Sequence, residues 1–223
     1  MTIPLRILPS LPPAPAELIE GFRQIPVANI SDNMNRLFAA GAALRPFHDG
    51  TVMCGTALTV RTRPGDNLLV HKALDMARKG DVIVVEAGGD LTNAIIGEIM
   101  LRYAASRGVA GFVIDGAIRD LEAVQAGNLP VFAGGVSHRG PYKDGPGEIN
   151  VPVAIGQTVV EPGSIVVGDA DGVVAIPPVL AEAVLVAARR HNAMERDIFK
   201  AIADDRFDRS WVDATLRSRG FIA

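Results

Sequence analysis

The hydrophobic positions in the middle of the chain alternate between two periods, and this alternation predicts the fold class. Residues 82–86 and 111–115 are short continuous apolar runs, as buried parallel strands show. Between them, residues 97–107 repeat apolar side chains at helical spacing. A short helix over 121–126 and a third strand over 130–132 complete the segment. The order strand, helix, strand, helix, strand predicts a parallel sheet with crossover helices.

Before this segment the pattern predicts two further helices and one strand. Ser31 and Asp32 precede apolar residues at helical spacing, which indicates an N-cap and a short helix. Residues 54–62 are rich in β-forming residues, and Asp66 follows a Pro-Gly turn as a candidate cap for the next helix. Residues 87–97, AGGDLTNAIIG, contain adjacent glycines and are predicted to form a loop.

The second half of the chain is predicted to be rich in β-structure. Residues 134–150 contain many glycines and prolines and have no period, which is typical of a loop. Short strands then follow, with a hairpin turn at Asp171-Gly172. The predicted strands cover 151–155, 157–160, 164–168 and 173–176. Residues 178–203 and 208–218 have the pattern of amphipathic helices.

No repeat, low-complexity tract or linker interrupts the chain, so we expect a single α/β domain over residues 1–223. Residues 1–24 are expected to form an N-terminal arm, and residues 178–223 the C-terminal helices. Prolines interrupt the first fifteen residues, which predicts an extended arm. Two alternatives stay open for this arm: a frayed tail, or a segment that packs on a neighbouring subunit.

Composition and charge exclude several classes of protein. The chain is 48% hydrophobic and 21% charged, which is ordinary for a globular protein. The net charge of −3 leaves no basic excess for phosphate contacts, so nucleic acid is not an expected partner. Cys54 is the one cysteine, which fits a reducing compartment. Because we find neither a signal-peptide core nor the ~20 apolar residues of a membrane span, we expect a cytoplasmic protein.

Common catalytic motifs are absent from the sequence. It contains no Walker A motif, no G-x-G-x-x-G fingerprint, no C-x-x-C or H-E-x-x-H zinc motif and no G-x-S-x-G elbow. The four histidines are scattered, and a scattered histidine is more often a surface or hydrogen-bonded residue than a ligand. The candidate chemistry therefore rests on the loops that follow the predicted strands.

Two predicted strand ends carry residues suited to binding. Ligands of open parallel sheets bind outside the carboxyl ends of the strands. The first end gives Gly88-Gly89 and leads to a helix start at Gly97, where free N–H groups suit a carboxylate. The second places Arg119 beside Asp120 in a short turn. Structural interpretations stay open: Asp120 as a plain N-cap with Arg119 as its surface partner, and the glycine pair as a plain turn.

The segment 80–120, GDVIVVEAGGDLTNAIIGEIMLRYAASRGVAGFVIDGAIRD, resembles the RraA-like family. Residues 64–74 and 140–177 do so as well. The most specific part is the pattern G-E-x5-A-x3-G-x2-G-x-V-x-D-G-x2-R-D, which runs from Gly97 to Asp120. The family contains class II 4-hydroxy-4-methyl-2-oxoglutarate aldolases, regulators of ribonuclease activity A, and members once labelled demethylmenaquinone methyltransferases. Methyltransfer is not expected here, because no glycine-rich nucleotide-binding loop is visible.

The resemblance implies a fold, an assembly and a set of residue roles. The fold is a three-layer αββα domain of the swivelling β/β/α kind, assembled as a trimer or hexamer with sites at subunit interfaces and a divalent metal, Mg²⁺ or Mn²⁺. The metal ligand falls on Asp120, the substrate contact on Arg119, and the acid that holds a water on the metal on Glu98. A carboxylate from a neighbouring subunit's C-terminal helix falls on Glu195. The segment expected to hold the substrate carboxylate through backbone amides contains Gly97, Ile99 and Met100.

Two functions follow as hypotheses. The first is a metal-dependent lyase that releases pyruvate from 2-oxo acids, by aldol cleavage of a substrate such as 4-hydroxy-4-methyl-2-oxoglutarate or by decarboxylation of oxaloacetate. The second is a non-enzymatic regulator that binds a ribonuclease or another protein. Within the loop 134–147, His138, Tyr142 and Lys143 either contact a distal group of the substrate or face solvent. Residue types do not discriminate Mg²⁺ from Mn²⁺, because both prefer oxygen ligands.

Overall fold

The computed structural model describes residues 5–222, which divide after Ala188 into two compact units. Its helices are α1 (Ala16–Arg23), α2 (Val27–Asp32), α3 (Leu68–Met76), α4 (Glu98–Ser106), α5 (Leu121–Ala126), a 3₁₀ turn (Pro178–Leu180), α6 (Ala181–Ala203) and α7 (Ser210–Ser218). Its strands are β1 (Arg45–Pro46), β2 (Met53–Thr62), β3 (Asp81–Ile96), β4 (Gly111–Ile118), β5 (Val131–Val136), β6 (Gly147–Ile149), β7 (Val153–Ile155), β8 (Thr158–Val160), β9 (Ile165–Asp169) and β10 (Gly172–Ile176). Among these helices, none has the length and apolar character to cross a membrane.

The first unit is built on a mixed sheet in the order β1-β5-β4-β3-β2-β9-β10. Strands β2, β3, β4 and β5 are parallel neighbours, connected by the helices α3, α4 and α5. Strand β9 pairs antiparallel with β2 and forms a hairpin with β10, while β7 and β8 form a separate hairpin. The parallel strand–helix alternation and the β-rich second half predicted from the sequence are confirmed.

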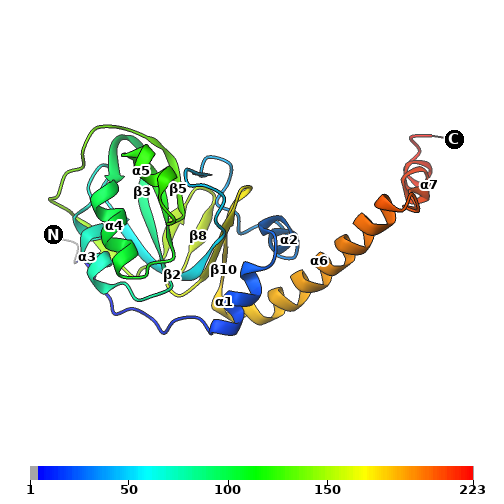
Figure 1. Ribbon diagram of the computed structural model, residues 1–223, viewed down its shortest axis with the longest axis horizontal. Coiled ribbons are helices and arrows are strands. Elements are labelled where there is room, and N and C mark those ends of the chain that lie inside the picture. Colours follow the sequence, from blue (N-terminus) through cyan, green and yellow to red (C-terminus); the bar gives the residue numbers. More distant parts are fainter. Residues whose placement is uncertain (1–4, 223) are drawn as a thin grey trace. The chain divides into compact units, whose positions relative to one another are not determined.

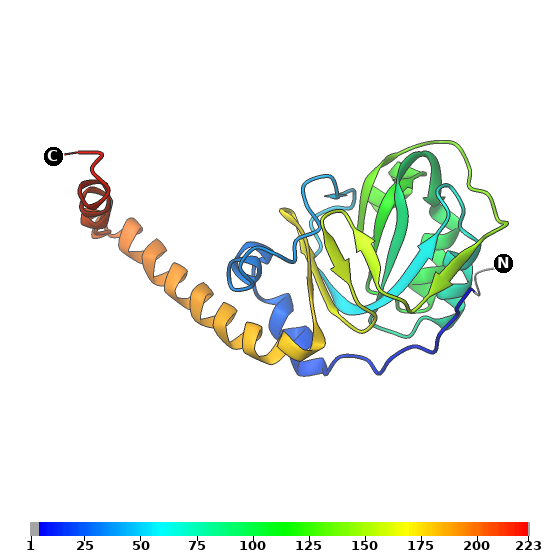
Figure 2. The ribbon, with the colours of Figure 1, turned by 180° about the vertical axis from the view of Figure 1, so that it is seen from behind.

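The helices and strands of this unit form stacked layers (Figures 1 and 2), and three apolar clusters lie between these layers. The first lies between the parallel strands and α3, α4 and α5, and contains Leu74, Met100 and Phe112. The second lies between the other face of the strands and the β7–β8 hairpin. The third packs α1, α2 and the start of α6 on β9 and β10, around Phe22 and Ile30. Each layer thus buries an apolar face against the next one, and the order of layers is α, β, β, α.

The prediction that residues 87–97 form a loop is wrong. Strand β3 runs through this segment from Asp81 to Ile96, and it keeps pairing with β4 beyond Glu86 at Asp90, Ala94 and Ile96, with a register shift before each of them. The register shifts after Glu86, where Gly88 and Gly89 adopt positive φ angles and form a bulge. Pairing with a neighbouring strand therefore outweighs the local preference of two glycines for a turn.

The helix predicted to start at Ser31-Asp32 is also misplaced. Helix α2 begins earlier, at Val27 after Pro26, and Asp32 is its last residue. The apolar residues that follow Ser31 and Asp32 at helical spacing are not on a helix. Met34 and Phe38 pack into the third cluster from an irregular segment, and Leu37 between them is exposed.

The described part of the N-terminal arm packs on its own chain. Residues 5–15 contain no helix, and Ile7 forms a parallel bridge with Ile149 at the end of β6. Arg6 pairs with Glu148 at 2.7 Å, which fixes the arm beside β6. The expected arm ended at residue 24, but the chain already turns into α1 at Ala16 because Phe22 packs into the third cluster. Residues 1–4 of the predicted arm lie outside the described residues.

Cys54 is expected to be unreactive in the folded chain. Its thiol is buried on β2 and donates a hydrogen bond to the carbonyl of Ile19. Burial raises the pKa of the Cys54 thiol to about 12, and the nearby Arg23 offsets this only in part. At pH 8 the native thiol should react with an aromatic disulfide about 10³-fold more slowly than the unfolded chain does. Reaction of the native thiol within tenfold of the unfolded rate would contradict this burial.

Candidate functional site

The two sequence-predicted loops with candidate chemistry meet beyond the ends of β3 and β4. Ile96 and Ile118, the last residues of these parallel strands, are register partners. The amide of Arg119 donates to the carbonyl of Ile96 at 3.0 Å, which holds the two loop starts together. Gly97-Glu98 and Arg119-Asp120 therefore share one edge of the sheet, at the position where open parallel sheets bind ligands.

Asp120 joins the two loops through its side chain. It sits at the N-cap position of α5 with a left-handed backbone, φ 57° and ψ 48°. The side chain makes no capping hydrogen bond to α5, so the interpretation of Asp120 as a plain N-cap is wrong. Instead its Oδ2 accepts a hydrogen bond from the amide of Glu98 at 2.8 Å. The carboxylate is 42% exposed, so it remains accessible to a ligand.

Two glycines, Gly97 and Gly140, leave space for the guanidinium of Arg119 beside the Asp120 carboxylate. Nε of Arg119 lies 3.8 Å from Oδ2 of Asp120. A methyl group at Gly97 would overlap Oδ2 of Asp120 and would come to 3.0 Å from Nε of Arg119. A methyl group at Gly140 would lie 3.2 Å from Nη1 of Arg119. The space around the Arg119-Asp120 pair thus depends on the absence of side chains at both positions.

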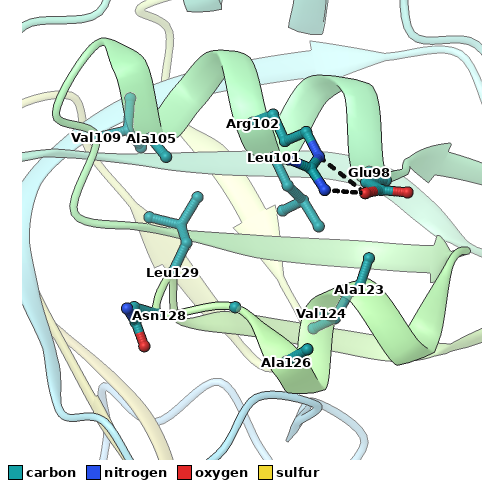
Figure 3. A pocket seen from close by; sticks show the side chains of 11 residues that line it. Glu98, Leu101, Arg102, Ala105, Val109, Ala123, Val124, Ala126, Asn128 and Leu129 are labelled. Atoms are coloured by element: carbon teal, nitrogen blue, oxygen red, sulfur yellow. Dashed lines mark hydrogen bonds and ion pairs between the residues drawn. The ribbon is translucent and has the colours of Figure 1, made fainter.

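Glu98 contributes its amide to this site, while its carboxylate points elsewhere. The carboxylate accepts hydrogen bonds from Arg102, at 2.8 Å from Nε and 2.6 Å from Nη2, one helical turn further along α4 (Figure 3). Glu98 and Arg102 border a largely apolar cavity of about 650 Å³ between α4 and α5. Residues Leu101, Val109, Val124 and Leu129 line its apolar part (Figure 3). The structure therefore places the predicted catalytic carboxylate of Glu98 in an exposed helix ion pair.

A smaller cavity of about 110 Å³ lies beside Arg119, which contributes to its lining. It is lined by Asn67, His71, Ile95, Ile96, Gly97, Ile99, Met100, Arg119, Pro141 and Lys143. The predicted substrate-binding residues Gly97, Ile99, Met100 and Arg119 are therefore brought together in one wall. The role assigned to them in substrate binding stays a prediction.

Asn67 and His71 in this cavity were missed by the sequence reasoning. Asn67 is 2% exposed, and its Nδ2 donates to the carbonyl of Ile95 at 2.8 Å. Its Oδ1 is buried and has no hydrogen-bond partner among the described residues, so one buried acceptor beside the cavity is unsatisfied. Burial lowers the pKa of His71, and the nearby Lys143 lowers it further, which favours a neutral imidazole.

The segment 134–147, predicted as a loop, is irregular only in part, because residues 134–136 belong to β5 and Gly147 begins β6. The loop between these strands contains residues that line the small cavity and residues that do not. Lys143 lines it, beside Pro141. Tyr142 is largely exposed and holds the guanidinium of Arg63 over its ring at 5.7 Å. His138 is exposed. Of the three residues considered for a distal substrate group, Lys143 is thus the one that reaches the cavity.

Gly88-Gly89, the glycine pair that precedes the predicted anion site at Gly97, lines neither of these two cavities. In the bulge of β3, a methyl group at Gly88 would meet Pro64, and one at Gly89 would meet Asp115. Burial raises the pKa of Asp115, although a hydrogen bond from the Gly89 amide opposes this. The glycine pair therefore acts as a structural bulge.

The residues present fit a hard divalent cation held mainly by water and substrate. Within residues 5–222, no three His, Cys, Asp or Glu side chains gather into a metal cage. Mg²⁺ commonly binds proteins through one or two carboxylates and keeps several waters. Asp120 offers one such carboxylate, with Oδ2 engaged by an amide and the group accessible at the edge of the sheet. This single ligand is compatible with the predicted Mg²⁺ or Mn²⁺.

Glu195, the carboxylate assigned to a neighbouring subunit's site, lies on α6 within the second unit, residues 189–222. There its Oε1 is 3.4 Å from Nε2 of His191. Its contribution to a site on another copy stays a prediction.

Comparison with known proteins agrees with these observations. A family model described as RraA-like, Aldolase/RraA, matches residues 27–175, and the chain belongs to this family. A relative from Halalkalibacterium halodurans, provisionally named a 4-hydroxy-4-methyl-2-oxoglutarate aldolase, is 42% identical over 192 residues, covering 86% of this chain and 91% of the relative.

Solved structures show the same fold. An uncharacterised protein from Pseudomonas syringae superposes with a TM-score of 0.79 at 28% identity, covering 87% of this chain and 96% of that one. The RNA-processing inhibitor RraA from Thermus thermophilus superposes with a TM-score of 0.64 at 30% identity, covering 69% of this chain and 93% of that one. A protein named as an aldolase and a protein named as an inhibitor are therefore both similar to this chain.

Proposed function

We propose that the chain is a divalent-metal-dependent lyase that releases pyruvate from 2-oxo acids. The reaction is aldol cleavage of a 4-hydroxy-2-oxo acid, such as 4-hydroxy-4-methyl-2-oxoglutarate, or decarboxylation of oxaloacetate. The observation that carries the proposal is the convergence of Arg119, Asp120 and the first turn of α4 beyond the ends of β3 and β4. The name of the Halalkalibacterium halodurans relative supports the substrate class.

The first turn of α4 suits the substrate carboxylate. The first N–H groups of a helix have no partner within the helix, and they attract anions. Here the amide of Glu98 is taken by Asp120, and the amides of Ile99 and Met100 follow it in the same turn. Both residues line the small cavity with Arg119, whose guanidinium can pair with a carboxylate or an enolate oxygen.

The chain's own residues account for the steps of the reaction as follows. In aldol cleavage the 4-hydroxyl loses a proton and C4 becomes a carbonyl as the C3–C4 bond breaks, and the electrons of that bond move onto the C2 carbonyl oxygen. Protonation of the resulting enolate at C3 gives pyruvate. Arg119 stabilises the negative oxygen that develops. A Mg²⁺ or Mn²⁺ ion on Asp120 would add Lewis-acid polarisation of that carbonyl. Decarboxylation of oxaloacetate gives the same pyruvate enolate, so one set of residues serves both reactions.

We propose Glu98 as the base that receives the hydroxyl proton, through an intervening water. Its carboxylate pairs with Arg102, and both side chains are exposed, with 42% and 79% of their side-chain surface accessible. An exposed ion pair of this kind within a helix contributes only about 0.3–0.5 kcal/mol, so the carboxylate can leave it at little cost.

The assembly we propose is a homotrimer or hexamer in which Glu195 of a neighbouring copy completes the site. The second unit leaves several large apolar side chains exposed, which is typical of a segment that contacts another chain. They are Met194, Phe199, Ile202, Trp211 and Phe221.

The test is a lactate dehydrogenase-coupled assay with oxaloacetate and with 4-hydroxy-4-methyl-2-oxoglutarate. We expect pyruvate release that EDTA abolishes and added Mg²⁺ or Mn²⁺ restores, because one carboxylate alone holds the cation weakly. A parallel reaction with metal and without protein corrects for spontaneous decarboxylation. If neither substrate, nor any other 2-oxo diacid, gives metal-dependent pyruvate, the lyase proposal is wrong. The non-enzymatic regulator, supported by the name of the Thermus thermophilus structure, would then be the better candidate.

A further inference from the structure

The buried carboxylate of Asp66, which is not part of the Arg119-Asp120 pair, connects two segments that line the small cavity. Asp66 is 0% exposed. Its Oδ1 accepts a hydrogen bond from the amide of Leu68 at 2.9 Å, at the start of α3. Its Oδ2 accepts hydrogen bonds from the amides of Asp144 at 2.8 Å and Gly145 at 2.9 Å. Arg63 completes the set, with Nη2 3.2 Å from the same oxygen.

Backbone hydrogen bonds extend this connection on both sides of Asp66. The amide of Tyr142 donates to the carbonyl of Gly65 at 2.8 Å, and the amide of Asn67 donates to the carbonyl of Tyr142 at 3.0 Å. The two segments therefore run side by side, with a parallel bridge between Asp66 and Tyr142. Lys143 is therefore held on both sides: Tyr142 before it bonds to the backbone of Gly65 and Asn67, and the amide of Asp144 after it bonds to Asp66.

The two residues next to these contacts line the cavity. Asn67 follows Asp66 directly and has an unpaired buried oxygen, and Lys143 brings a positive charge to the cavity lining. Asp66 does not line the cavity itself. We propose that Asp66 is a positioning residue: its carboxylate fixes Asn67 and Lys143 in the cavity wall and thereby sets how tightly the cavity binds its ligand. The identity of that ligand, a 2-oxo acid, rests on the proposed function.

The charge state of Asp66 agrees with this role. Burial by itself raises the pKa of the Asp66 carboxyl, but the amides of Leu68, Asp144 and Gly145, together with Arg63, outweigh burial and lower it. The group is therefore ionised at neutral pH and acts only as an acceptor. Its loss would leave buried amide donors without a partner, which is costly.

A second buried carboxylate provides a matched control. Asp81 is 1% exposed and accepts hydrogen bonds from Arg78, at 2.9 Å from its amide and 3.4 Å from its Nε. It stands at the start of β3, at the opposite end of that strand from the cavity residue Ile96, and it lines neither cavity. Asp81→Asn therefore removes a comparable buried charge without touching the cavity wall.

Steady-state kinetics separate positioning from stability. For Asp66→Asn we expect the KM for oxaloacetate to rise about tenfold or more, with kcat changed about threefold at most, because the –NH₂ that replaces one carboxylate oxygen donates hydrogen bonds and cannot accept one from a backbone amide. Asp81→Asn should lower the thermal midpoint comparably and leave KM unchanged. In a Lys143→Ala background, Asp66→Asn should raise KM by a smaller factor, since part of its effect passes through Lys143. Equal changes of KM in Asp66→Asn and Asp81→Asn, or an unchanged KM in Asp66→Asn, would overturn the proposal.

Amide hydrogen exchange provides a readout that needs no substrate. In the wild-type chain, the amides of Asp144 and Gly145 should exchange more slowly than that of His138, an exposed residue of the same loop. Asp66→Asn should speed exchange at both amides, and Asp81→Asn should not. If the wild type releases no pyruvate, the proposed function fails. Amide hydrogen exchange at Asp144 and Gly145 then still decides whether Asp66 fixes the loop. Fast exchange of both amides in the wild type would refute the positioning role even if Asp66→Asn did not fold.

Discussion

Asp120→Asn is expected to lower the turnover number for pyruvate release by on the order of 10²–10³, by analogy with the removal of one oxyanion donor. Asparagine keeps the shape of the side chain, and its Oδ1 can still accept the hydrogen bond that Oδ2 of Asp120 takes from the amide of Glu98. The fold should therefore persist, and the substitution removes only the negative charge that would hold the metal cation. Turnover and the thermal midpoint of unfolding, measured on the same preparations, separate the two effects.

Glu122→Gln is the matched control for this change. Glu122 is an exposed acid in the first turn of α5, two residues from Asp120, and lines neither cavity. Its neutralisation should leave turnover unchanged. An Asp120→Asn protein that keeps turnover within about fivefold of wild type, a change near 1 kcal/mol, would show that this carboxylate is not part of the chemistry.

Arg119 and Asp120 are proposed to act on the same transition state, so the losses of turnover caused by replacing each of them should not add. Arg119→Ala is expected to reduce turnover by a similar factor of about 10²–10³. Residues that act together in one transition state give grossly non-additive effects, so the double variant should be only slightly worse than either single one. Additive losses would indicate that the two side chains act independently.

The order of elements could be predicted because the apolar runs at 82–86 and 111–115 are continuous, as those of buried parallel strands are. The meeting of Gly97 and Arg119 also followed, since consecutive parallel strands place their carboxyl ends at the same edge. What the pattern did not reveal was the continuation of β3 through Gly88 and Gly89. That continuation depends on pairing with β4, and strand formation depends more on neighbours than on local preference.

The side-chain directions at the site could be predicted only where they are local. Glu98 and Arg102 are four residues apart on a helix, and this spacing is sufficient to predict their ion pair. The orientation of Asp120 is different, because it depends on a left-handed backbone and on an amide 22 residues away in sequence. Asn67 was missed for a related reason: its place in the cavity requires that β2 lies next to β3 in the sheet.

Gly97→Ala is expected to reduce turnover by about 10², because a misplacement of the reacting groups by about 1 Å has an effect of that size. The backbone of Gly97 is extended, with φ −153° and ψ −170°, so alanine fits the chain conformation. The added methyl group, however, would overlap Oδ2 of Asp120 and crowd Nε of Arg119 at 3.0 Å, and these side chains must move. Steady-state turnover with saturating metal, measured beside the thermal midpoint, gives the size of the effect.

Gly134→Ala is the appropriate comparison, because a methyl group there would also crowd its neighbours, at 3.3 Å from the carbonyl of Gly116 and the side chain of Leu91, but away from the Arg119-Asp120 pair. It adds the same methyl group to β5 of the same sheet without contact to the Arg119-Asp120 pair, and turnover should stay near the wild-type value. Full activity in Gly97→Ala would mean that the pair can shift without loss. In that event the fixed position of Asp120 against the Glu98 amide would not be the property on which the reaction depends.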